Sequence, residues 1–90
     1  MIFNNDIPYV VYTDGSTGKG MVEDYVSNAW ATVGSADFTP GGASYIDPVF
    51  YNNNLYVAYS DGTKTNFVTV EEYTGGSWSM IGTEGFGGQA

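Results

Sequence analysis

The chain repeats itself, and this internal repeat constrains its fold more than any other feature. The segment IPYVVYTDG at 7–15 returns as NLYVAYSDG at 54–62. Tyr12 of the first copy therefore lies 47 positions before Tyr59 of the second. After the Asp-Gly of each segment the spacing becomes 48, and the two tryptophans then fall in register. A period in the forties indicates a fold made from two copies of one supersecondary unit.

Each copy divides into four short segments that have the composition of β-strands. Val, Tyr, Phe and Thr dominate them, and Asn, Asp-Gly or Gly-Gly closes them, as is typical of strands joined by tight turns. In the second copy they span 43–52, 55–62, 66–76 and 77–86. No apolar period of 3.6 residues extends over a helical length. The sequence therefore predicts an all-β chain whose unit is a meander of four antiparallel strands.

Four-stranded units that recur with this period are typical of β-propeller blades. The layout also resembles kelch repeats and related bacterial secreted propeller repeats. In those repeats an apolar strand ends in a glycine turn, and a tyrosine shortly precedes the tryptophan that opens the outermost strand. The corresponding residues here are Asp61-Gly62, Tyr73 and Trp78. Kelch blades carry Gly-Gly directly after the apolar run, where this chain has Ser60-Asp61-Gly62, so the resemblance implies a blade layout and no family function.

The repeat also places the boundaries between the two blades. We expect residues 1–42 to form the first blade, whose innermost strand is truncated, together with a linker. Residues 43–90 are expected to form the second blade and a C-terminal lead-in to the next chain, because FGGQA at 86–90 repeats FTPGGA at 38–43.

Two blades do not close a propeller. A blade has two apolar faces and needs a neighbour on each, so a chain of two blades leaves one face open at each end. We therefore expect either that copies of the chain close a head-to-tail ring or that the chain belongs to a longer parent protein, and the ring is favoured. Only even blade totals are possible, and a trimer with six blades is favoured over a tetramer with eight. The plan resembles that of small bacterial fucose-binding lectins, although their sugar sites depend on an arginine that this chain lacks.

Composition excludes several classes of function. Without cysteine or histidine, the chain has no disulfide scaffold and no zinc site of the Cys/His type. Its formal charge of −8, with Lys19 and Lys64 as the only basic side chains, is unsuited to nucleic acid and to anionic membranes. No apolar run is long enough to span a membrane. The acidic, cysteine-free composition, rich in Gly, Asn and Tyr, favours a secreted or cell-surface protein of bacterial type.

Acidic residues at repeated positions are the first candidates for a binding site. Asp14 and Asp61 lie in the Asp-Gly turns, where they either bond nearby backbone amides or form a partial Asp-box like that of sialidase-type propellers. Glu23 and Glu71 each begin a doubled carboxylate in the third strand of their copy. They either protect a solvated strand edge or contact calcium or sugar hydroxyls at a blade boundary.

Repeated aromatic residues are the second group of candidates. Trp30 and Trp78 begin the fourth strands, and Tyr25 and Tyr73 end the third strands. Such side chains either pack between blades or stack on a sugar ring. In the second strand of the second copy, alternation predicts that Leu55, Val57 and Tyr59 pack on one side and that Tyr56 and Ala58 pack on the other.

Two functions follow from these patterns. The first is a non-enzymatic, multivalent, lectin-like module that binds carbohydrate or a surface. Its candidate ligand-binding residues are Trp30, Trp78, Tyr25, Tyr73, Asp14, Asp61, Glu23 and Glu71. No cofactor is expected, and Ca²⁺ is the one alternative that these carboxylates would admit. The alternative is a structural or adhesive propeller fragment of a longer repeat protein, or an engineered or ancestral-like unit, with no small-molecule site. We expect no enzyme, because histidine, cysteine and arginine are absent, which leaves only an acid-pair glycosidase or a calcium-dependent lyase.

Overall fold

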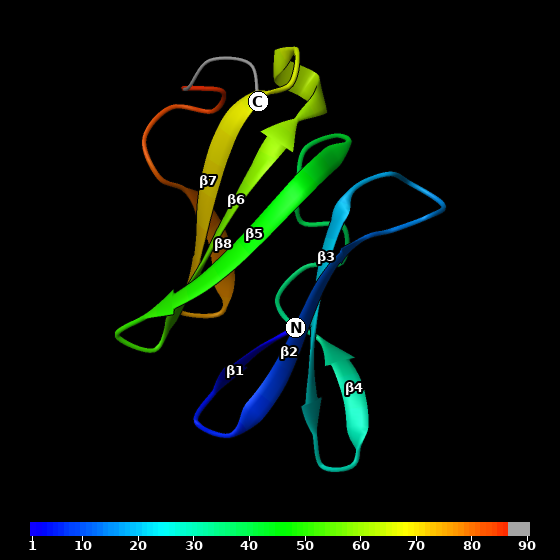
Figure 1. Cartoon of the computed structure of the whole chain (residues 1–90), viewed down its shortest axis with the longest axis vertical. Coiled ribbons are helices and arrows are strands. Elements are labelled where there is room, and N and C mark those ends of the chain that lie inside the picture. The colour runs from blue at the N-terminus through cyan, green and yellow to red at the C-terminus, as the bar shows by residue number, and fades with distance from the viewer. Residues whose placement is uncertain (87–90) are drawn as a thin grey trace.

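The protein consists of two four-stranded antiparallel sheets, each with its strands in chain order (Figure 1). A computed structural model describes residues 1–86. The first sheet contains β1 (Ile2–Asn4), β2 (Ile7–Thr13), β3 (Gly20–Val26) and β4 (Ala29–Thr32). The second sheet contains β5 (Ala43–Tyr51), β6 (Asn54–Asp61), β7 (Phe67–Thr74) and β8 (Ser77–Met80). The predicted all-β class and the two four-stranded units are confirmed. The predicted lead-in at 86–90 lies, apart from Phe86, outside the described residues.

In each sheet, a two-residue turn sets the register of the hairpin that the first two strands form. Asn5 and Asp6 join β1 to β2, and both have positive φ, at 51° and 64°. Asn52 and Asn53 do the same between β5 and β6, with φ of 50° and 66°. Positive φ at both central positions is the signature of the type I′ turn, whose twist matches that of antiparallel strands and which favours Asn, Asp and Gly. The repeated turn residues therefore explain why both copies form the same hairpin.

The connection between the second and third strands differs between the two copies. In the second sheet it contains a short 3₁₀ helix, η1 (Gly62–Lys64), which the sequence pattern did not predict. The side chain of Asp61 caps this turn by accepting from the Thr63 backbone N–H at 3.0 Å. The change of repeat spacing from 47 to 48 falls in this loop, so the strands on either side keep equivalent partners.

Each sheet has a closed face, which contacts the other sheet, and an open face, which points away from it. Side chains of cross-strand partners share a face, and neighbours along a strand alternate between faces. The closed face of the first sheet presents Tyr9, Val11, Val22 and Val33, and its open face presents Phe3, Tyr12, Glu23, Tyr25 and Trp30. The closed face of the second sheet presents Phe50, Leu55, Val57, Tyr59, Glu71, Tyr73 and Trp78, and its open face presents Tyr56, Ala58, Val70, Glu72 and Ile81.

The hydrophobic core lies between the two closed faces. Val22 of the first sheet and Leu55, Val57 and Tyr59 of the second are buried in one cluster. Burial of such side chains contributes about 1.5–3 kcal/mol each, so this contact holds the two sheets together. The predicted packing of Leu55, Val57 and Tyr59 on one side of β6 is confirmed.

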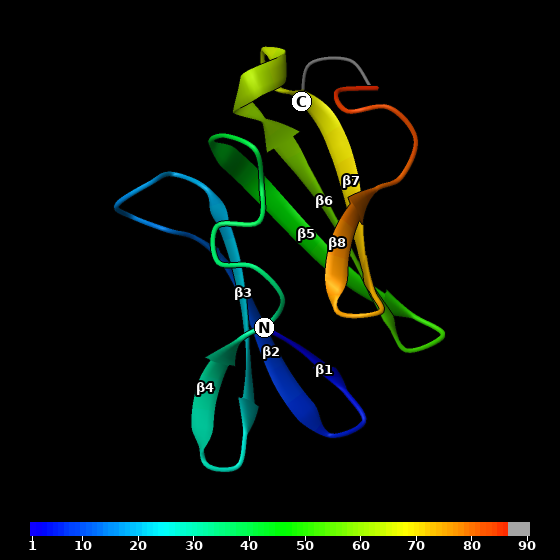
Figure 2. The same cartoon turned by 180° about the vertical axis from the view of Figure 1, so that it is seen from behind.

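The segment that joins the sheets, residues 33–42, runs from the end of β4 to the start of β5 (Figure 2). It is fixed to the first sheet, because the Phe38 backbone N–H donates to the Gly20 carbonyl at 3.0 Å. It is fixed to the second sheet, because the Phe38 ring stacks on Trp78 with centroids 4.1 Å apart. The connection is therefore part of the contact between the sheets.

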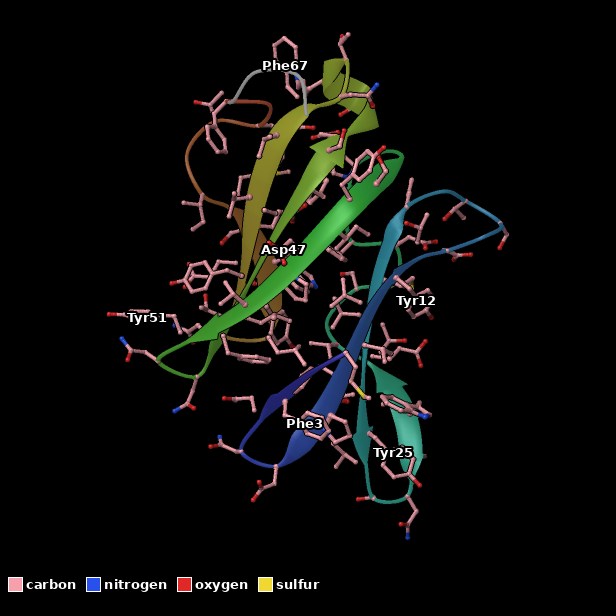
Figure 3. The ribbon with its side chains drawn as sticks, viewed as in Figure 1. Phe3, Tyr12, Tyr25, Asp47, Tyr51 and Phe67 are labelled. Carbon is pink, nitrogen blue, oxygen red and sulfur yellow. The ribbon has the colours of Figure 1, made fainter. Side chains whose placement is uncertain are left out.

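The first strand of the second sheet, β5, contains an irregularity that the sequence pattern did not predict. The register of β5 against β6 shifts between Ser44 and Asp47, and Tyr45 within the shift has φ of 52°. A β-bulge of this kind bends a strand and turns its side chains. Tyr45 is thereby exposed, while Asp47 lies midway along β5 (Figure 3).

Candidate functional site

The two turn aspartates act in local structure. Asp14 accepts from the backbone N–H and the hydroxyl of Ser16, both at 2.9 Å, and these bonds lower the pKa of Asp14. Asp61 is fully buried and accepts from the hydroxyls of Thr63 and Thr69 at 2.7 and 2.8 Å. Burial alone would raise the pKa of Asp61, but its hydrogen bonds with Glu84, Thr63 and Thr69 outweigh burial and lower it. Both carboxylates are therefore engaged in holding their turns.

The two candidate glutamates each pair with a tyrosine of the neighbouring strand. The Tyr59 hydroxyl donates to Glu71 Oε2 at 2.5 Å, and Glu71 is only 3 % exposed. The Tyr12 hydroxyl donates to Glu23 Oε2 in the equivalent place on the first sheet. Burial is the main reason why the pKa of Glu71 is raised. The Tyr–Glu pair of the second sheet is thus buried on its closed face, whereas the equivalent pair of the first sheet is accessible on its open face.

The two tryptophans show the same contrast. Trp78 packs against Phe38 and Tyr73, and its indole Nε1–H donates to the Val33 carbonyl at 3.3 Å. Trp30 packs against Tyr25, with ring centroids 5.2 Å apart, and remains 46 % exposed. Trp78 therefore joins the two sheets, whereas Trp30 occupies the equivalent place on an open face.

A cleft of about 250 Å³ lies where the closed faces of the two sheets meet. Its lining comes from both sheets and consists of Tyr9, Asp24, Thr32, Val33, Gly34, Phe50, Asn53, Leu55 and Tyr73. Leu55 and Val33, which belong to the buried core, form part of this lining. The rings of Tyr9 and Phe50 meet edge to face with centroids 4.8 Å apart. The cleft is therefore a preformed concavity lined by core, aromatic and polar side chains.

Polar groups of different kinds converge on this cleft. Asp24 supplies a carboxylate acceptor, and Asn53 supplies an amide that both donates and accepts. Thr32 also lines the cleft, but its pairing with Glu23 places its side chain on the open face. The pKa of the Tyr9 hydroxyl is raised by burial first and then by the charge of Asp24. Polar groups placed among apolar and aromatic side chains are the means by which small-molecule sites orient a ligand.

The candidates named from the sequence overlap this cleft at only one residue, Tyr73. Asp24 was missed because Glu23 was named in its place. Alternation along β3 puts these neighbours on opposite faces, and only the packing of the sheets decides which face meets the cleft. Tyr9 and Asn53 were missed because a tyrosine in an apolar strand and an asparagine in a turn have ordinary structural roles.

The acidic residues do not assemble a metal centre in the part of the chain that the structure describes. Within residues 1–86, no three Asp or Glu side chains are placed to hold one metal ion. Across the same residues, no helix is long and apolar enough to cross a membrane.

Comparison of the chain with protein-family models, with curated proteins and with solved structures found no match.

Proposed function

We propose that the chain is a non-enzymatic, multivalent binding module in which the cleft between sheets takes a small, neutral, polar ligand such as one ring of a carbohydrate. The observation that carries this proposal is the lining of the cleft, where aromatic side chains lie beside a carboxylate, an amide and hydroxyls. A sugar ring presents apolar C–H faces and hydroxyls that donate and accept, so it complements such a lining. The volume of about 250 Å³ suits a single ring better than a drug-sized ligand.

The same lining argues against hydrolysis. A glycosidase of the usual kind places two carboxylates about 5–9 Å apart across the scissile bond. Asp24 is the one carboxylate among the described residues that line the cleft. Glu71 and Asp61 are buried in hydrogen bonds of their own. Binding without catalysis is therefore the proposal that this arrangement supports.

Multivalency enters through assembly into a β-propeller ring. Each four-stranded sheet would form one blade, so that the chain would supply two. A head-to-tail trimer would close six blades, and a tetramer would close eight. Each chain would bring one cleft of its own, so weak sites would be repeated around the ring and gain avidity on a surface that displays many sugars.

Calorimetry tests the ligand half of this proposal. The probes are neutral methyl glycosides of glucose, galactose, mannose and N-acetylglucosamine, titrated to millimolar concentration. We expect at least one to bind and its affinity to fall when Asp24→Asn removes the carboxylate from the cleft.

Asp47→Asn is the matched control, because Asp47 is an exposed strand aspartate that does not line the cleft. The control should bind as the unchanged chain does. If no neutral glycoside binds at millimolar concentration, or if both variants lose binding equally, the cleft is not a sugar site.

A structural or adhesive propeller without a small-molecule site is the second candidate function. It is favoured by the roles of the sequence candidates, since Trp78 and Glu71 are committed to packing and to hydrogen bonds between elements. This candidate predicts the same assembly with no glycoside binding, and the calorimetry above separates the two.

A further inference from the structure

The contact between the two sheets has a second set of matching surfaces that the chain cannot bring together by itself. We propose that the open face of the first sheet binds the open face of the second sheet of another copy, in the arrangement that the two closed faces have within one chain. This inference rests on the assembly half of the proposed function and names the residues that perform it. It does not depend on the ligand.

The open face of the first sheet repeats the residues of the closed face of the second. Phe3, Tyr12, Glu23, Tyr25 and Trp30 stand where the second sheet has Phe50, Tyr59, Glu71, Tyr73 and Trp78. Within the chain, that closed face is what the first sheet binds. The open face is therefore built to bind a surface like the closed face of the first sheet (Figure 3, where Phe3, Tyr12 and Tyr25 are labelled).

The open face of the second sheet supplies that surface. Tyr56, Ala58, Val70, Ile81 and Gly82 stand where the first sheet has Tyr9, Val11, Val22, Val33 and Gly34. The Val33 N–H donates to the Val22 carbonyl at 2.9 Å, and the Ile81 N–H donates to the Val70 carbonyl at 2.8 Å. The backbone of the two surfaces is thus alike, and the side chains keep their apolar or aromatic character.

Three contacts within the chain each predict a contact between copies. The Trp78 indole donates to the Val33 carbonyl at 3.3 Å, so Trp30 would donate to the Ile81 carbonyl of the next copy. Tyr9 meets Phe50 with centroids 4.8 Å apart, so Tyr56 would meet Phe3.

The third contact involves the segment after each sheet. Phe38 stacks on Trp78, so Phe86 would stack on Trp30 of another copy. Phe86 and Phe3 are 58 % and 60 % exposed in the single chain. Burying large aromatic side chains drives protein association, and the proposed contact would bury both phenylalanines.

Two glycines give the most specific sign of a missing neighbour. Gly34 has φ of 70°, and a Cβ on it would lie 2.7 Å from Trp78 Nε1 and 2.8 Å from Tyr73 Cε1. Gly82 has nearly the same conformation, with φ of 75°, yet a Cβ on it would meet no heavy atom within 4 Å. Gly34 makes room for a Tyr–Trp pair that is present, so Gly82 would make room for Tyr25 and Trp30 of another copy.

A second copy fits these faces better than an unrelated partner does. The two open faces differ from each other, so they form a heterologous contact, and each chain can use both at once. The Glu23 carboxylate on one face already accepts from Tyr12, as Glu71 does from Tyr59, so burying it leaves no new carboxylate without a donor. Both halves of the contact, and its geometry, are present in one chain.

Substitution at glycine tests the inference by solution mass. Gly82→Ala adds a methyl group where the next copy would pack, and we expect a large loss of oligomer at a fixed protein concentration. Gly75→Ala is the matched control, since Gly75 also has positive φ, at 59°, and a Cβ there meets nothing within 4 Å. The control should keep the mass of the unchanged chain. Equal masses for the two variants would overturn the inference.

Cross-linking between two single-cysteine variants tests the geometry directly. The chain has no cysteine of its own, so Phe3→Cys and Tyr56→Cys each introduce one thiol. A short bismaleimide should join the two proteins when they are mixed and should join neither protein to itself. Tyr9→Cys with Phe50→Cys in one chain is the positive control, because these two rings touch within the chain.

Each outcome decides between the alternatives. A linked pair that forms only in the mixture supports head-to-tail contact. A linked pair within either single variant, or no link in the mixture while the control reacts, overturns it. If the solution mass is that of a ring but the cross-link fails, the chain assembles through faces other than these. Glycoside binding is measured separately by calorimetry.

Discussion

The hydroxyl of Tyr59 makes a buried hydrogen bond that the equivalent Tyr12 makes on an exposed face. It donates to the buried carboxylate of Glu71 at 2.5 Å, and burial together with this bond raises the pKa of Tyr59. Tyr59→Phe would leave the carboxylate buried without its donor. We expect the free energy of unfolding, measured by urea denaturation, to fall by about 1–3 kcal/mol.

Tyr45→Phe is the control for this loss, because Tyr45 is 84 % exposed. Removal of an exposed hydroxyl should change the free energy of unfolding by no more than about 0.5 kcal/mol. If the two variants are equally stable, the bond between Tyr59 and Glu71 does not stabilise the second sheet.

Glu71 also makes stability depend on pH. Burial raises the pKa of Glu71 in the folded chain, so the folded state favours the protonated form more than the unfolded state does. The stability that this difference provides is present below the unfolded pKa and is lost as pH rises through the raised folded pKa.

Glu71→Gln removes this titration and keeps an oxygen that can accept from Tyr59. We expect the variant to gain stability relative to the unchanged chain as pH rises from acidic to neutral, measured by urea denaturation across that range. A difference in stability that stays constant with pH, or a variant that loses stability relative to the unchanged chain as pH rises, would contradict this role.

At the residue scale the sequence predicted positions better than roles. The register of the repeat placed Tyr12 and Tyr59, and alternation separated Glu23 from Asp24. Whether a residue is buried depends on which face meets the other sheet, and that choice is made by packing between elements far apart in the chain. The bond between Tyr59 and Glu71 could not be read from composition for that reason.

Strands and turns are the elements that the sequence predicted most fully. Short β-prone runs between Asn and Gly turns gave all four strands of the second sheet, because a type I′ turn fixes a hairpin locally. The bulge at 44–47 and the 3₁₀ helix η1 were not predicted. Both depend on where neighbouring strands end and on side chains such as Asp61, which no local propensity records.

The segment after β4 offers a prediction at the element scale. Gly34 has positive φ and lies against Trp78 and Tyr73 at distances that leave no room for a methyl group. We expect Gly34→Ala to lower the free energy of unfolding by about 2–4 kcal/mol, the sum of a left-handed backbone cost and overpacking.

Gly75→Ala separates these two costs, since Gly75 has positive φ in open space. It should lower the free energy of unfolding by only about 1–2 kcal/mol, the backbone cost alone. Equal losses in thermal or urea denaturation would mean that Gly34 is not required for packing between the sheets.

At the scale of the whole molecule, the two sheets contact each other through one face each. One pair of faces is closed around Val22, Leu55, Val57 and Tyr59, while the equivalent pair remains open. The repeat predicts this imbalance, because two stacked sheets cannot cover each other on both faces. It could not predict the cleft, whose lining joins Asp24 of the first sheet to Asn53 of the second and exists only once the sheets have packed.

The mass of the unchanged protein in solution tests the central claim most directly. Sedimentation equilibrium at micromolar to millimolar concentration measures it without reference to shape. Closure by head-to-tail contact predicts a discrete oligomer, with three times the chain mass of 9.7 kDa favoured over four times. A chain that stays at 9.7 kDa throughout this range would contradict the claim that the open faces bind each other.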